Sequence, residues 1–189
     1  YKGVHLGISI DAIGDLAYYV RHPSKWKVIE RNIDKLANFT KQNKNIFVQM
    51  HTTLSCLNLH DLPNLLEWSK QNYENWHYTW DWGPYGYQNC IPHFNLVEYP
   101  SYMHIKHLPD KIKNWCNEML DNEYKKYSAL DLNEWEYISV NNIIGIKNTL
   151  NQDRDPAEWK KFLEVIKASD QYRGLDIKDY IPWIQEYII

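Results

Sequence analysis

The chain has 189 residues, of which 44% are hydrophobic, and a formal net charge of −3. This length suits a single domain with a sizeable core. There is no basic stripe, so nucleic-acid binding has no electrostatic support. There is also no apolar run of about 18 residues, so we expect no transmembrane helix. No signal-peptide pattern is visible, and we expect a cytoplasmic protein.

Residues that could bind a metal are scattered along the chain. The three cysteines, Cys56, Cys90 and Cys116, are far apart and form no CxxC pattern. We therefore expect free thiols in a reducing cytosol rather than a disulfide framework or a zinc site. His104 and His107 are three residues apart, but a metal would need a third convergent ligand. We expect no metal site.

A first strand is predicted at about residues 4–10, where two kinds of side chain alternate. The aliphatic set is Val4, Leu6, Ile8 and Ile10, and the small or polar set is His5, Gly7, Ser9 and Asp11. A second strand at about residues 46–53 places Gln49, His51 and Thr53 on one face. Successive strand residues point to opposite faces, so each strand has a face that suits helices and a polar face that does not.

The remaining elements follow in chain order. Gly14 predicts a turn, and Ser24 after Pro23 predicts the N-cap of an amphipathic helix that ends near residue 43. Asp61 can cap a second helix, and the aromatic, turn-rich residues 72–89 predict a long loop. A third strand is expected at 94–98, and further helices at about 110–126, 133–150, 156–168 and 177–188.

This order of elements predicts an α/β fold. Alternating strands and helices favour a parallel sheet, and a polar inner face suits the lumen of a barrel that holds a polar ligand. We expect a partial (half) parallel β/α barrel of about three strands over residues 1–110. Residues 111–189 are expected to form an α-helical C-terminal extension packed on it.

Several stretches resemble the radical S-adenosylmethionine (SAM) enzymes, above all the branch with SPASM or twitch extensions, in virus-associated and environmental members. Residues 7–36 (GISIDAIGDLAYYVRHPSKWKVIERNIDKL) resemble the fourth strand and helix of their barrel, and residues 47–68 (FVQMHTTLSCLNLHDLPNLLEW) resemble the fifth. Residues 95–113 resemble the sixth strand region, and residues 167–184 the C-terminal segment. The likeness is good over about residues 3–70, fair near 94–113 and weak between.

The chain also departs from this family. It lacks the CxxxCxxC loop that binds the 4Fe-4S cluster, and Ala12 stands where a glycine is usual. We therefore expect the C-terminal half of such a protein, with an upstream half missing. Alone it is expected to bind no cluster and to be inactive. In the full-length protein, the resemblance implies reductive SAM cleavage and radical hydrogen abstraction, with a peptide as the commonest substrate in that branch.

The resemblance and the ends of the strands point to Ser9, Asp11, Arg21 and Asn58 as cofactor-binding residues. Asp11 can accept hydrogen bonds from ribose hydroxyls or cap its own turn. Arg21 can pair with the methionine carboxylate or be a surface arginine at a helix entrance. Asn58 can bind the cofactor or fix its own loop. No catalytic residue is assigned.

Gln49, His51 and Thr53 are the expected substrate-binding residues, with a satisfied core histidine as the alternative for His51. A second hypothesis is a non-catalytic peptide- or protein-binding module that uses the aromatic loop at residues 76–87. A third is self-association, or pairing with a separate N-terminal half, to cover an open sheet edge.

Overall fold

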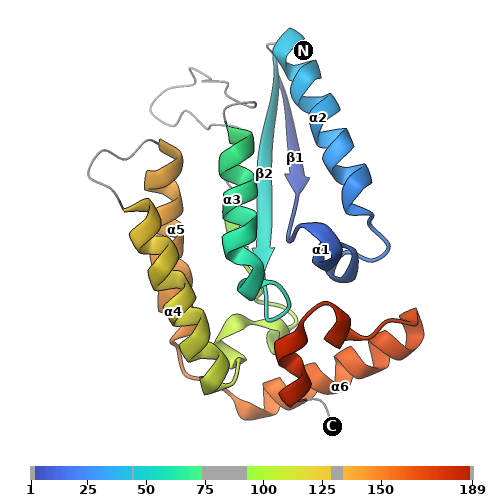
Figure 1. Ribbon diagram of the computed structural model, residues 1–189, viewed down its shortest axis with the longest axis vertical. Coiled ribbons are helices and arrows are strands. Elements are labelled where there is room, and N and C mark those ends of the chain that lie inside the picture. Colours follow the sequence, from blue (N-terminus) through green and yellow to red (C-terminus); the bar gives the residue numbers. More distant parts are fainter. Residues whose placement is uncertain (1–2, 44, 74–92, 129–133, 188–189) are drawn as a thin grey trace.

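A computed structural model describes residues 3–43, 45–73, 93–128 and 134–187. In these ranges the chain is a mixed α/β protein, mostly helical, with three parallel strands in one open sheet (Figure 1). The strands are β1 (Val4–Ser9), β2 (Ile46–Leu54) and β3 (His93–Leu96). The helices are α1 (Gly14–Val20), α2 (Trp26–Gln42), α3 (Leu62–Tyr73), α4 (Asp110–Tyr127), α5 (Glu134–Leu150) and α6 (Pro156–Arg173).

The predicted strands and their parallel pairing are confirmed. The sheet has the order β1-β2-β3. Ser9 of β1 lies opposite His51 of β2, and His51 lies opposite His93 of β3. The predicted alternation of β2 also holds, because Val48 and Met50 are buried whereas the residues between and after them are only half-buried.

Helices α2 and α3 cover one face of the sheet. Ile33 and Ala37 of α2 and Leu65 of α3 form a buried cluster with Val48 and Met50. Burying a side chain of this size stabilises the fold by about 1.5–3 kcal/mol. Both helices therefore gain their stability from the aliphatic face that the alternation in the sequence predicts.

Two helix boundaries near the N-terminus differ from the prediction. The N-cap of α2 is Lys25, not Ser24, because the Ser24 amide donates to the Arg21 carbonyl in the preceding turn. Helix α1 begins at Gly14, where only a turn is expected, and it buries Leu16 and Tyr19. Gly14 has φ of 57°, a conformation that glycine adopts easily and other residues rarely do.

The helix predicted at about residues 177–188 is not a continuous α-helix. Residues 177–188 contain two short 3-10 segments instead, η5 (Ile177–Asp179) and η6 (Pro182–Glu186). Pro182 has no N–H to donate to the preceding turn, so an α-helix cannot continue through it. Helix α6 runs on to Arg173, five residues beyond its expected end, and Gly174 stops it with φ of 67°.

The main core joins the two ends of the chain. One buried cluster holds Tyr19 of α1 and Leu54 of β2 together with Phe162 of α6 and Ile184 of η6. In Figure 1 the arrowheads of β1 and β2 point toward the end of the molecule where α6 and the C-terminal segment lie. The carboxyl edge of the sheet is therefore built against the C-terminal helices.

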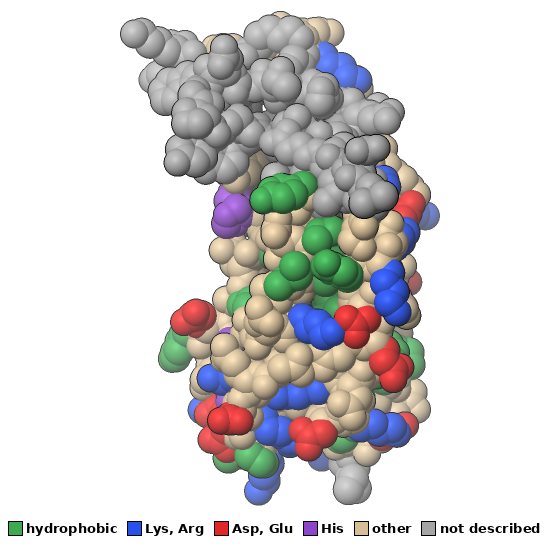
Figure 2. Space-filling model, turned by 90° about the vertical axis from the view of Figure 1, so that its left-hand side faces the viewer, with side chains coloured by type: hydrophobic (Ala, Val, Ile, Leu, Met, Phe, Trp, Pro, Cys, Tyr) green, Lys and Arg blue, Asp and Glu red, His purple; other side chains and the backbone are tan. Residues whose placement is uncertain are grey.

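Figure 2 shows hydrophobic side chains gathered between charged ones on the side of the molecule that carries α4 and α5. Tyr124 and Ile144 are exposed there and line a shallow hollow of about 220 Å³ with the ion-paired Lys147 and Asp121. Among the residues that the structure describes, no helix is long and apolar enough to cross a membrane.

His60, in the turn η1 (Leu59–Asp61) after β2, connects the sheet to the helical layer. Its ring centroid lies 6.4 Å from that of Trp115 in α4 and 5.8 Å from that of Trp183 in η6. Burial lowers the pKa of His60 to about 4, and its Nδ1 has no hydrogen-bond partner in the described part of the chain. The folded protein therefore holds this imidazole neutral.

Acid is therefore expected to destabilise the fold through His60. Its pKa is about 6.5 in the unfolded chain, so the unfolded state takes up the proton first as the pH falls. The stability is complete above pH 6.5 and declines toward pH 4, by at most about 3 kcal/mol from this residue. His60→Gln should lack this part of the decline in urea unfolding at pH 7, 6, 5 and 4. The control variant His22→Gln, at an exposed position, should show the same decline as wild type. If the stability of wild type and of His60→Gln declined equally with pH, His60 would not be the cause.

Candidate functional site

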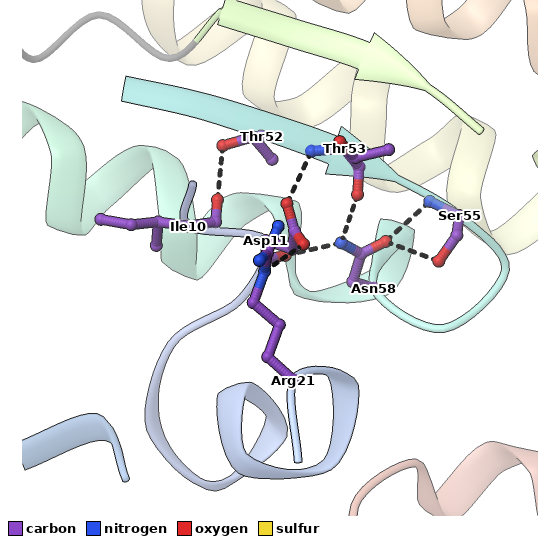
Figure 3. A network of polar contacts seen from close by, with 7 residues as sticks. All are labelled: Ile10, Asp11, Arg21, Thr52, Thr53, Ser55 and Asn58. Carbon is purple, nitrogen blue, oxygen red and sulfur yellow. Dashed lines mark hydrogen bonds and ion pairs between the residues drawn. The ribbon is translucent and has the colours of Figure 1, made fainter. Parts of the chain in front are cut away.

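A polar network ties the carboxyl ends of β1 and β2 together (Figure 3). Asp11, two residues beyond β1, is buried, and its Oδ1 accepts a hydrogen bond of 2.8 Å from the Thr53 amide. Its Oδ2 accepts one of 2.6 Å from Nε of Arg21. Beside it, the buried Thr52 hydroxyl donates to the Ile10 carbonyl at 2.6 Å. The Asp11 carboxylate therefore holds the two strand ends in register.

Asn58 is the centre of this network, and its side chain is almost fully buried. Its Nδ2 donates to the carbonyls of Asp11 (2.6 Å) and Thr53 (2.9 Å). Its Oδ1 accepts from the amide and the hydroxyl of Ser55. A carboxamide has two donors and one oxygen with two lone pairs, so Asn58 is fully used. The loop-fixing alternative for Asn58 matches this geometry.

Helix α1 places Arg21, its C-cap residue, beside Asp11. The helix is itself anchored to α6, because the buried Tyr19 hydroxyl donates to Oδ1 of Asp170 at 2.8 Å. Arg173 also donates to the Tyr19 carbonyl, and its guanidinium lies over the Tyr19 ring. Burial raises the pKa of the Tyr19 hydroxyl. The C-terminal helix thus supports the segment that carries Arg21.

The predicted cofactor residues therefore fall into two groups. Asp11 and Asn58 are buried and bonded within the network, and neither Asp11 oxygen makes a turn-capping bond to residues 12–14 among the contacts of the described chain. The Ser9 side chain is exposed, and the Arg21 side chain is 43% exposed. The network brings Asp11, Arg21 and Asn58 together. Their contacts with a cofactor remain predictions.

The face of the sheet opposite α2 and α3 is polar. It carries Gln49, His51 and Thr53, which are half-buried, and the exposed Ser9. His93 and Asn95 of β3 are exposed and lie in register with His51 and Thr53. The third strand is predicted to begin at Phe94, which leaves out His93, and Asn95 lies within the predicted strand but is assigned to no face. Extending the two-residue period back by one position places His93 on the same face as Asn95.

The two cysteines that the structure describes do not suit an iron–sulfur cluster. Cys56 and Cys116 are free thiols buried in the main core. Burial raises the pKa of Cys116 to about 12 and also raises the pKa of Cys56, which disfavours the thiolates that bind metals. In the described ranges no three His, Cys, Asp or Glu side chains are placed to hold a metal ion. Cys90 and the aromatic loop at residues 76–87 lie outside those ranges.

Comparisons with known proteins identify no relative. No family model matches the chain, and neither a curated protein nor a solved structure matches it.

Asn58→Ala is expected to destabilise the protein by about 3 kcal/mol, because it leaves the carbonyls of Asp11 and Thr53 and the Ser55 amide without their partner. The matched control is Asn64→Ala, which removes one exposed side-chain hydrogen bond to Asp61 and should change stability by at most about 0.5 kcal/mol. Urea unfolding at pH 7 measures both. Equal losses in the two variants would mean that the network does not hold the strand ends.

Replacing Asp11 is expected to destabilise the protein more than replacing its ion-pair partner Arg21. Asp11→Ala removes the acceptor of the Thr53 amide as well as the charge, and should cost about 2 kcal/mol or more. Arg21→Gln should cost about 1 kcal/mol, because the arginine side of the pair is 43% exposed and screened by water. Thermal unfolding of both variants tests this order. A larger loss for Arg21→Gln would overturn it.

Proposed function

We propose that this chain is the C-terminal half of a radical SAM barrel, covering part of the cofactor- and substrate-binding surface. The observation that carries the proposal is the sequential strand order β1-β2-β3 with parallel pairing. Successive strands are added in one direction, so their helices α2 and α3 lie on one face, and with right-handed crossovers this arrangement is compatible with part of a β/α barrel. Doubly wound sheets reverse direction and cover both faces.

Two further features support a partial barrel. The polar face carries Ser9, Gln49, His51 and Thr53 where a barrel would have its lumen, with the strand ends at one edge. Strand β1 pairs with β2 alone among the described strands, so it is the edge strand at which a preceding strand would be added. We propose that an upstream half of the same protein pairs there. Self-association along β1 is the alternative arrangement.

The residues of this chain would bind and orient rather than react. Ser9 and Arg21 stand at the carboxyl edge, where the hydroxyl and the guanidinium can bond the ribose and carboxylate of SAM. Gln49, His51 and Thr53 face the substrate side. SAM supplies the reductive cleavage and hydrogen abstraction when it is bound. No described residues of this chain are placed to hold the 4Fe-4S cluster, so we assign its ligands to the upstream half. The free thiols of Cys56 and Cys116 are compatible with a location in the cytosol.

The test is anaerobic reconstitution, with iron and sulfide, of the protein extended by its upstream coding sequence. Under reducing conditions it should release 5′-deoxyadenosine from SAM, detected by chromatography. Ser9→Ala should lower this rate at subsaturating SAM by about tenfold, the loss expected from one hydrogen bond to the cofactor. Ser24→Ala, at the entrance to α2, is the matched control and should leave the rate unchanged.

Residues 1–189 alone should release none. If the extended protein has no CxxxCxxC within about 150 residues upstream, a span of typical domain size, or if it releases no 5′-deoxyadenosine, the proposal is wrong.

A further inference from the structure

One row of side chains crosses all three strands on the polar face. Ser9 lies opposite His51 in the β1–β2 register, and His51 lies opposite His93 in the β2–β3 register. Aligned residues of parallel strands point to the same side of a sheet. The ring centroids of His51 and His93 are 5.5 Å apart. A hydroxyl and two imidazoles from three neighbouring strands therefore lie in one row on the same face.

Gly7 sets the position of the His51 ring. A Cβ atom added at Gly7 would lie 3.3 Å from Cδ2 and 3.4 Å from Nε2 of His51. The imidazole therefore lies against the backbone of β1, and a side chain at position 7 would push it away by a few tenths of an ångström. The φ of Gly7 is not in the left-handed region, so this position does not need a glycine for its backbone conformation. What glycine provides here is space for the His51 ring.

The chemistry of the row favours an anion. Imidazole N–H and hydroxyl groups donate hydrogen bonds to oxyanions. Among the described residues of β1, β2 and β3 there is no carboxylate, and Asp11 beyond them has both oxygens engaged with Thr53 and Arg21. Arg21 adds a partly exposed positive charge near the same edge. A metal ion would need a third strong ligand, which the described residues do not place there.

We infer that Ser9, His51 and His93 bind an oxyanion, the carboxylate or phosphate group of a small substrate, and that Gly7 leaves the room in which the His51 ring takes its position. That the anion belongs to a substrate rests on the proposed function. The anion site itself requires only the polar face that Ser9, His51 and His93 share. Such a site would select a ligand that carries a negatively charged group and places this group against the polar face of the sheet.

The experiment follows the imidazole nitrogens of the ¹⁵N-labelled chain by long-range ¹H–¹⁵N correlation spectra. The protein is titrated with inorganic phosphate and, separately, with acetate, at pH 7 and at constant ionic strength kept with sodium chloride. His51 and His93 should shift together along one saturable curve. His60, His104 and His107, which lie off this face, are internal controls and should not follow it. The stronger of the two anions identifies the phosphate or the carboxylate source.

Two variants test the geometry. Gly7→Ala should weaken binding by up to about tenfold, because the added methyl pushes the His51 ring away from β1 by a few tenths of an ångström. Gly145→Ala is its matched control, since a Cβ at Gly145 meets nothing within 4 Å. His93→Gln, at an exposed position, should also weaken binding, and unchanged His60 resonances verify its fold.

The inference is overturned if His51 and His93 do not saturate with either anion, if the off-face histidines follow the same curve, or if Gly7→Ala binds like Gly145→Ala. These outcomes are independent of SAM cleavage. Release of 5′-deoxyadenosine without anion binding would refute this site alone, and anion binding without that release would refute the proposed function alone.

Discussion

The fold depends on the carboxamide of Asn58. In the described part of the chain, it is the one side chain that bonds to the segment after β1, to the end of β2 and to the loop that precedes α3. A parallel sheet has no tight hairpin to align its strands, so their ends need a separate connection. Asn58 supplies it with neutral, buried hydrogen bonds, and Asp11 adds a charged one to the Thr53 amide.

This arrangement separates support from contact at the edge of the sheet. Buried groups with complete hydrogen bonding, such as Asn58, hold the backbone, and their replacement is felt as lost stability. Ser9, at the end of β1, and His93, at the start of β3, are exposed to solvent instead. Rigid positioning of accessible polar side chains is what a binding site requires. Polar side chains near this edge therefore differ in role according to whether they are buried or exposed.

Much of the fold could be predicted because it follows from local periodicity. The alternation of Val48 and Met50 with polar neighbours gave β2, and the helical spacing of Ile33 and Ala37 gave α2. Helix α1 was missed because it is only seven residues long and is held by the contact of Tyr19 with Asp170. The bonding of Asn58 could not be read from the chain either, since it joins backbone groups that approach one another only after the strands pair. The exposure of His93 likewise depends on where β3 begins.

The bond between Tyr19 and Asp170 spans 151 residues of sequence. Such a contact must be closed against a large loss of chain entropy, so it forms only when most of the polypeptide is already compact. During synthesis, Tyr19 emerges 151 residues before its acceptor, so this bond can form only after α6 has been made. Helix α1 is therefore completed by a contact with a helix that is synthesised later.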